Sequence, residues 1–332
     1  MNSQDHVLLL GTSGGPRWRR TRSGISTAVV VGGDVYLVDC GYGAGAQLSR
    51  SGHSPARLRA VLVTHLHSDH TADLANLLLY GWYEGLEDVV APVTCLGPPS
   101  RGSFPDVAAD GGRVPRLVRP EEPAPGFTAM VRHLGAAYAT DLNDRMRDTR
   151  RRDPRELLTV ADIELPEGLV IDPDHDAAPD VEPWVVLEDD RVRVTATLVQ
   201  HAPMAPAFAF RFDTDSGSVV VSGDTGPCEN LVRLATGADV LVHEVIDEEY
   251  VARAYENGRT AQQRAMIAHH LSAHTTVPQV GQIAERAGVR TLVLSHFVPG
   301  DIDVPRWHEA AKHFSGELVI GEDLQRVPIA AP

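Results

Sequence analysis

Six apolar stretches of the sequence, each with the length and composition of a β-strand, end in a histidine or an aspartate. The six terminal residues are Asp39, His65, His201, Asp224, His243 and His296. A single polar residue in such a place is usually a hydrogen-bonded strand end. Six such residues are better explained by strands whose ends converge at one edge of packed sheets. The pattern therefore predicts a β-rich fold with one polar site at a sheet edge.

The expected elements alternate between short strands and helices. Strands are expected at 6–11, 26–33, 35–41, 58–65, 191–202, 207–214, 217–226, 238–245, 290–297 and 316–321. Helices are expected at 44–51, 72–82 and 275–288, in a long stretch that ends at His270, and near Trp307. Thr275 or Thr276 is suited to cap the helix at 275–288, and Gly288 to end it.

Residues 98–185 differ from the rest of the chain, because they are rich in proline, glycine and charge. One amphipathic helix is expected inside this region, at 127–149. The region is interpreted as an insertion that forms either a lid over the site or a homodimer contact. The basic cluster at 145–155 is interrupted by two aspartates and is interpreted as a solvated helix end.

Composition limits the partners that the chain is expected to have. The formal net charge of −15 favours repulsion from a phosphate backbone, so no nucleic-acid partner is expected. The three cysteines are scattered, which argues against a disulfide framework or a thiolate zinc site. The sequence begins without the features of a signal peptide and contains no membrane-length apolar run, so a cytoplasmic protein with no membrane partner is expected.

The most concentrated metal-binding signal is the run HLHSDH at 65–70. His65 and His67 are two residues apart and point the same way on an extended segment, whereas Asp69 and His70 follow where a turn can redirect them. Imidazole and carboxylate suit zinc, and also manganese or iron. One metal cannot easily use all four side chains, but two adjacent metals can. Such a dinuclear site is suited to hydrolysis.

The motifs HLHSDH, SGDT (222–225), LVHE (241–244) and LSHF (294–297) resemble those of the metallo-β-lactamase superfamily. With LLGTSGG (8–14) and VYLVDCG (35–41), they are most similar to the branch that contains RNase Z and arylsulfatase-like hydrolases. The resemblance implies one α+β domain over 1–332, folded as a four-layer αββα sandwich. It implies a first metal held by His65, His67, His201 and Asp224, and a second held by Asp69, His70, Asp224 and His296.

The same resemblance implies a general acid. In the RNase Z-like branch a glutamate of an HE motif orients a later histidine, and the matching pair here is Glu244 and His274. His274 would protonate the leaving oxygen. With Asp69, these two residues form the expected catalytic set, while Asp39 would support the metal-binding loop from behind.

Four kinds of function remain open, and a hydrolase of small phosphodiesters or aryl sulfates is preferred. A lactonase, β-lactamase or thioesterase-type acyl hydrolase would use the same ligands. A tRNA 3′ endonuclease is ranked lower, because RNase Z of the short kind carries a long arm between the residues matching His201 and Asp224. Only 22 residues (202–223) lie there, enough for a hairpin. A metal-binding or redox module is ranked low, because Leu66-His67 lack the carboxylate expected of a flavodiiron site.

Overall fold

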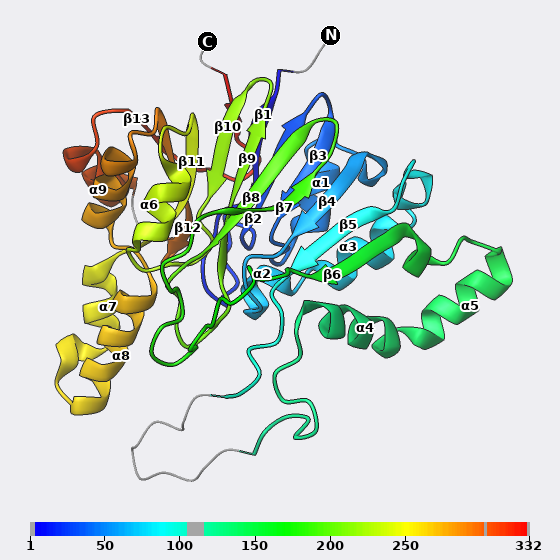
Figure 1. Ribbon diagram of the computed structural model, residues 1–332, viewed down its shortest axis with the longest axis horizontal. Coiled ribbons are helices and arrows are strands. Elements are labelled where there is room, and N and C mark those ends of the chain that lie inside the picture. The colour runs from blue at the N-terminus through cyan, green and yellow to red at the C-terminus, as the bar shows by residue number, and fades with distance from the viewer. Residues whose placement is uncertain (1–3, 105–115, 302–303, 331–332) are drawn as a thin grey trace.

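Two mixed β-sheets lie face to face in the computed structural model, which describes residues 4–104, 116–301 and 304–330 (Figure 1). Within these residues each sheet has seven strands. The first has the order β14-β1-β2-β3-β4-β5-β6, formed by Arg326–Pro328, His6–Gly11, Ser26–Val31, Asp34–Val38, Leu58–Leu62, Val93–Gly97 and Leu158–Asp162. The second has the order β13-β12-β11-β10-β9-β8-β7, formed by Glu317–Ile320, Thr291–Val298, Val240–Ile246, Gly217–Val221, Phe208–Thr214, Val192–Leu198 and Trp184–Glu188.

The core between the sheets follows from the alternation of side chains along each strand. Val192 and Val194 of β8 and Phe208 and Phe210 of β9 point inward and are buried. They pack with residues of the first sheet such as Tyr36 in one hydrophobic cluster. Because this cluster draws on both sheets, it holds the two inner layers together.

Helices cover the outer face of each sheet (Figure 1). The first sheet buries its other face against α1 (Ala44–Arg50) and α3 (Leu74–Gly81). The second sheet packs against α6 (Glu229–Ala235) and α9 (Val277–Ala287). The 3-10 helix η5 (Val304–His313) lies in the same layer. The result is the four-layer αββα sandwich that the sequence predicted.

Two expected helices are each broken in the structure. The stretch 127–149 forms α4 (Phe127–Ala137) and α5 (Ala139–Thr149), which meet at a non-helical Tyr138. The stretch ending at His270 forms α7 (Glu248–Ala254) and α8 (Ala261–Ala273). Asn257 and Gly258 lie between them with φ of 55° and 70°, a left-handed conformation that interrupts a right-handed helix.

The region 98–185 contributes strands to both sheets, and so it is not only an insertion between them. It supplies β6 to the edge of the first sheet, and β7 begins within it at Trp184 on the edge of the second sheet. Both strands were missed from the sequence. Helix α4 packs against β5 and β6, and α5 continues from its end (Figure 1). Phe127 of α4 and Leu142 of α5 are buried in the same hydrophobic cluster as Leu74 of α3. Residues 105–115 of the region lie outside the described part, and the roles of lid or dimer contact stay predictions.

Two properties anticipated from composition can be compared with the structure. Cys40, Cys95 and Cys228 are free thiols. Among the residues that the structure describes, no helix has the length and apolar character needed to cross a bilayer.

Candidate dinuclear metal centre

The HLHSDH run leaves the sheet at the end of β4 and divides its side chains into two sets. His67 is extended (φ −64°, ψ 148°) and precedes the short helix α2 (Ser68–Thr71), which begins the turn. This change of backbone direction separates His65 and His67 from Asp69 and His70. His65 and His70 are fully buried and Asp69 is 8% exposed, so the run is not a solvated loop.

The first set is a three-histidine group formed by His65, His67 and His201. His67 Nδ1 lies 3.0 Å from His65 Nε2 and 3.2 Å from His201 Nε2. His201 Nδ1 lies 2.8 Å from the Ala273 carbonyl oxygen, which accepts its proton and leaves the Nε2 lone pair facing the group. Three ring nitrogens that converge in this way form a suitable binding site for a cation.

The second set is a carboxylate–histidine group formed by Asp69, His70, Asp224 and His296, whose ligand atoms lie within 4.8 Å of one another. His296 Nε2 is 3.4 Å from Asp69 Oδ2. His70 Nδ1 lies 2.8 Å from Asp39 Oδ2, so Asp39 orients the ring and directs its Nε2 toward the group. Asp39 thus supports the loop from behind, as expected.

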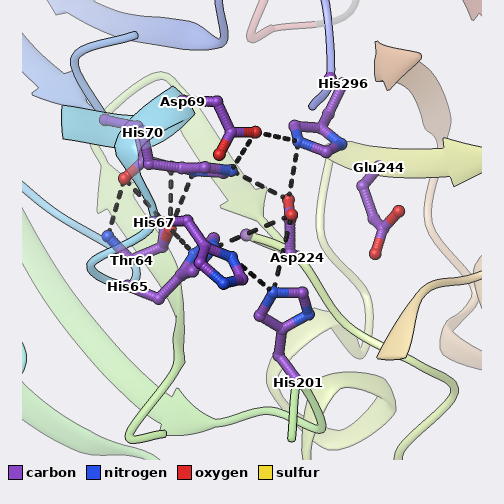
Figure 2. Close-up of polar contacts among 12 residues, drawn as sticks. Thr64, His65, His67, Asp69, His70, His201, Asp224, Glu244 and His296 are labelled. Atoms are coloured by element: carbon purple, nitrogen blue, oxygen red, sulfur yellow. Dashed lines mark hydrogen bonds and ion pairs between the residues drawn. The ribbon is translucent and has the colours of Figure 1, made fainter. Parts of the chain in front are cut away.

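Asp224 joins the two groups (Figure 2). Its Oδ1 lies 3.2 Å from the Nε2 atoms of both His70 and His296, whereas its Oδ2 lies 3.9 Å from those of His65 and His201. Asp224 Oδ1 and His70 Nε2 are buried and have no hydrogen-bond partner among the described residues. Buried polar atoms that lack partners but point at one another suit a pair of cations bridged by this carboxylate.

The electrostatics of the three-histidine group favour the forms that bind metal. Burial lowers the pKa of His201 to about 3, and burial together with neighbouring histidines lowers the pKa of His65 strongly. Both rings are therefore neutral at pH 7 and present lone pairs. In the carboxylate–histidine group, Asp69 has a pKa below its ordinary value despite its burial, because His70 and His296 lie beside it. An ionised carboxylate and neutral imidazoles are the protonation states that divalent metals require.

The carboxylate–histidine group attracts positive charge. Burial opposes protonation of His70, but Asp224, Asp39 and Asp69 together raise its pKa well above the ordinary value. The same carboxylate, Asp224, raises the pKa of His296. A divalent cation at this place would compete with protons for the two rings.

Glu244 and His274 form a separate pair beside the metal-binding groups. Glu244 lies on β11 and accepts a 2.7 Å hydrogen bond from the Thr225 amide, while His274 follows the last residue of α8. His274 Nδ1 is 4.0 Å from Asp224 Oδ2. Burial opposes protonation of His274, but the hydrogen-bonded Glu244 carboxylate raises its pKa to about 9. His274 is therefore a cation at pH 7 that can donate a proton.

Two residues, Gly15 and Thr64, make contacts at the site that were not anticipated from the sequence. The Gly15 amide donates a 3.0 Å hydrogen bond to Asp69 Oδ2, and the Thr64 hydroxyl lies 2.8 Å from Asp39 Oδ2 and 3.1 Å from His65 Nδ1. Thr64 adjoins the first histidine at a strand end, and that position is the only sequence signal it offers. Gly15 is brought to Asp69 from 54 residues away, which no local pattern indicates.

The metal-binding groups open into a cavity of about 280 Å³, called here the metal-site cavity. Its wall includes Pro16, Pro203, His274 and residues of both metal-binding groups. A second cavity of about 420 Å³, lined mainly by proline, methionine and phenylalanine side chains, shares His67 and Pro203 with it. His243, by contrast, is fully buried and does not line the metal-site cavity.

Comparison with known proteins shows the family to which this chain belongs. The family model described as the metallo-beta-lactamase superfamily matches residues 20–296. Ribonuclease Z of Mycobacterium bovis (strain BCG / Pasteur 1173P2) is 33% identical over 97% of this chain and 98% of its own length. Ribonuclease Z of Mycobacterium avium (strain 104) is 34% identical over 98% of this chain and 99% of its own length.

Solved structures share the fold at lower identity. The short form of human tRNase Z matches with a TM-score of 0.62 and 19% identity, over 98% of this chain and all (100%) of its own. The metallo-beta-lactamase fold protein YhfI from Bacillus subtilis matches with a TM-score of 0.61 and 18% identity, over 98% of this chain and 99% of its own.

These relatives contradict two predictions made from the sequence: the preference for small phosphodiester or aryl sulfate substrates, and the absence of a nucleic-acid partner. The relatives matched over nearly the whole chain at 33–34% identity are ribonucleases. The 22 residues after His201 do form a hairpin of β9 and β10, but this was a poor guide to substrate. Net charge was a poor guide too, because RNA contacts depend on where arginines gather and not on their sum.

Proposed function

We propose that this chain, which belongs to the RNase Z-like branch of the metallo-β-lactamase superfamily, is a ribonuclease that processes the 3′ end of tRNA precursors. Its family also makes it a metal-dependent hydrolase. The observation that carries the proposal is the 33–34% identity to ribonuclease Z proteins, which extends over at least 97% of this chain. A match of that extent spans both sheets and is not limited to one motif or segment of the chain.

We assign seven side chains to two divalent ions, with zinc as the first choice because histidine and carboxylate ligands suit it. They are His65, His67 and His201 for the first ion, Asp69, His70 and His296 for the second, and Asp224 between them. Bound there, the ions would supply the Lewis acidity that phosphodiester hydrolysis needs. Manganese and iron remain alternatives for the same ligand types.

The remaining chemistry comes from the chain itself. Cleavage of RNA leaves a ribose oxygen that must gain a proton. Glu244 holds His274 through Nδ1 and keeps the ring protonated at pH 7, so the Nε2 proton is available for that oxygen. Asp69 is held in place by the Gly15 amide and is assigned to metal binding and thus to catalysis.

The substrate must be held by parts of the chain other than the segment 202–223. The long arm that the resemblance to RNase Z of the short kind implied for this segment is replaced here by the tight hairpin of β9 and β10. The end of α5 carries exposed arginines instead: Arg147 lies in its last turn, and Arg150 and Arg152 follow it. We propose that these guanidinium groups contact phosphates distant from the cleavage site.

The test is cleavage of a 3′-extended tRNA by the purified protein with added zinc or manganese. We expect one cut at the 3′ side of the tRNA body, and none in Asp224→Ala. The matched control is Asp213→Ala, which alters a partly exposed aspartate of β9 away from the metal groups. A metal-loaded protein that leaves the extended tRNA intact would refute the proposal, as would cleavage that persists in Asp224→Ala.

A further inference from the structure

A second cavity, of about 420 Å³, adjoins the metal-site cavity, and the two share His67 and Pro203. Its wall comes from the HLHSDH run, from residues within 98–104 and 123–130, and from the segment 203–206. Six prolines line it: Pro98, Pro99, Pro123, Pro125, Pro203 and Pro206. We call this cavity the proline pocket.

The proline pocket is largely apolar and its walls are stiff. Each proline ring holds its own backbone φ near about −65°, so the walls lose little freedom when a ligand enters. Met130 and Met204 add polarizable thioethers, and Phe104 adds an aromatic ring. The volume lies in the range of about 300–1,000 Å³ that is usual for ligand pockets. Walls of this kind suit a flat aromatic ligand such as a nucleobase.

Arg101 places a guanidinium group in this apolar wall. Its side chain is 8% exposed, its Nη2 pairs with Asp174 at 2.9 Å, and its Nη1 donates to the Pro203 carbonyl oxygen. The Arg101 Nε is buried and has no hydrogen-bond partner among the described residues. Because buried N–H groups normally have partners, a free one in a cavity wall indicates a ligand that carries an acceptor.

Main-chain acceptors around the proline pocket are already engaged. The carbonyl oxygens of three lining residues, Pro98, Ala124 and Pro203, each accept a hydrogen bond. The pocket therefore offers a donor but few free acceptors. Uracil has two carbonyl oxygens and suits this arrangement better than adenine, whose exocyclic amine would be buried without a partner.

The position of His274 indicates which nucleotide the pocket receives. In the proposed reaction, His274 protonates the oxygen that remains on the tRNA body. His274 lines the metal-site cavity but not the proline pocket, which borders the metal-binding groups at His67 instead. The nucleotide beside the pocket is then the one that keeps the scissile phosphate, which is the first nucleotide of the 3′ extension.

We propose that the proline pocket binds the base of this first extension nucleotide, with uracil preferred, against Met130 and Met204 and with a carbonyl oxygen on Arg101 Nε. The inference rests on the proposed ribonuclease function and adds a base-binding subsite to it. Met130 and Met204 are positioning residues, because they hold the base and thereby place the scissile phosphate at the metal-binding groups.

Base binding is tested with two substrates and the metal-loaded enzyme. One is a tRNA whose 3′ extension begins with uridine, and the other has an abasic nucleotide at that position. In wild type the abasic substrate should have a KM higher by about tenfold, with little change in kcat. In Met130→Ala/Met204→Ala the two KM values should differ much less, because the base has lost its walls. The matched control Met146→Ala alters a methionine of α5 in a different groove and should behave as wild type does.

The role of Arg101 is tested by base preference. Replacing the first extension uridine by adenosine should raise the wild-type KM by about fivefold or more. Arg101→Met should remove this difference, because no donor is left to favour a carbonyl oxygen. Asp174→Asn is the control, since it alters the partner of Nη2 and leaves Nε in place, and it should keep the preference for uridine.

The outcomes separate this inference from the proposed function. If wild type cleaves the uridine and abasic substrates with equal KM, the inference is wrong and the function stands. The inference is also wrong if the abasic effect persists in full in Met130→Ala/Met204→Ala, since the base would then be held elsewhere. Equal KM values for uridine and adenosine would overturn the contact with Arg101. If wild type cleaves no extended tRNA, the proposed function and this inference fall together.

Discussion

His274 Nδ1 lies 3.0 Å and 3.1 Å from the two carboxylate oxygens of Glu244. Glu244 is almost fully buried and also accepts a hydrogen bond from the Thr225 amide, so its position is set by the fold. A carboxylate in this place fixes both the orientation and the charge of the ring. In the proposed reaction, this ring supplies the proton that the leaving ribose oxygen requires.

The first prediction concerns the pH dependence of cleavage. The pKa of His274 is raised to about 9, so the acid form is present at neutral pH and is lost as the pH rises through that value. In Glu244→Gln the carboxylate no longer offsets burial, so the pKa falls and the alkaline limb of the kcat profile should move to lower pH. His274→Ala should lower kcat by about 10²–10⁴-fold. Unchanged alkaline limbs in both variants would exclude His274 as the acid.

The second prediction concerns metal stoichiometry. We expect wild type to bind two divalent ions per chain, measured by elemental analysis after dialysis. Asp224→Ala should lose both, because its two oxygens face both groups, whereas His65→Ala should lose mainly one. Retention of two ions by Asp224→Ala would rule out a bridging carboxylate.

The third prediction concerns Asp39, which orients His70 at 2.8 Å. Asp39→Asn removes the charge that holds the ring and should weaken binding of one metal by about 10–100-fold in a chelator competition. Asp73→Asn is the matched control, because Asp73 accepts from the Gly45 amide and contacts no metal-binding histidine. Equal metal affinities in the two variants would mean that Asp39 has no such role.

The fourth prediction concerns acid stability. Burial lowers the pKa of His243 to about 4, so between that value and about 6.5 the unfolded chain binds a proton that the folded chain does not. Stability should therefore fall as pH decreases through this window, and His243 should account for about 2 kcal/mol of the loss between pH 7.5 and 5. Urea unfolding of metal-free His243→Leu should show a weaker pH dependence than wild type. The exposed His308→Ala should behave as wild type does.

Several parts of the fold could be predicted because their signals are local. The strand β1 has the bounds expected from its apolar run, and α9 begins after a Thr276–Gln279 capping box and ends at Gly288 with φ of 64°. The edge strand β6 was missed, since it lies among proline-rich and charged residues and is defined by pairing with β5. Pairing partners distant in sequence leave no periodic pattern in the strand itself.

The sequence by itself determined the chemistry available to this protein, because ligand type and spacing in HLHSDH restrict the metals and the reaction class. Only the tertiary structure decided how those residues meet, with Asp224 facing two groups and His274 held by Glu244. It also brought Gly15 and Pro16 to the wall of the metal-site cavity, where the Gly15 amide is bonded to Asp69. Local patterns report side-chain chemistry, whereas contacts across 54 or 30 residues depend on how the whole chain packs.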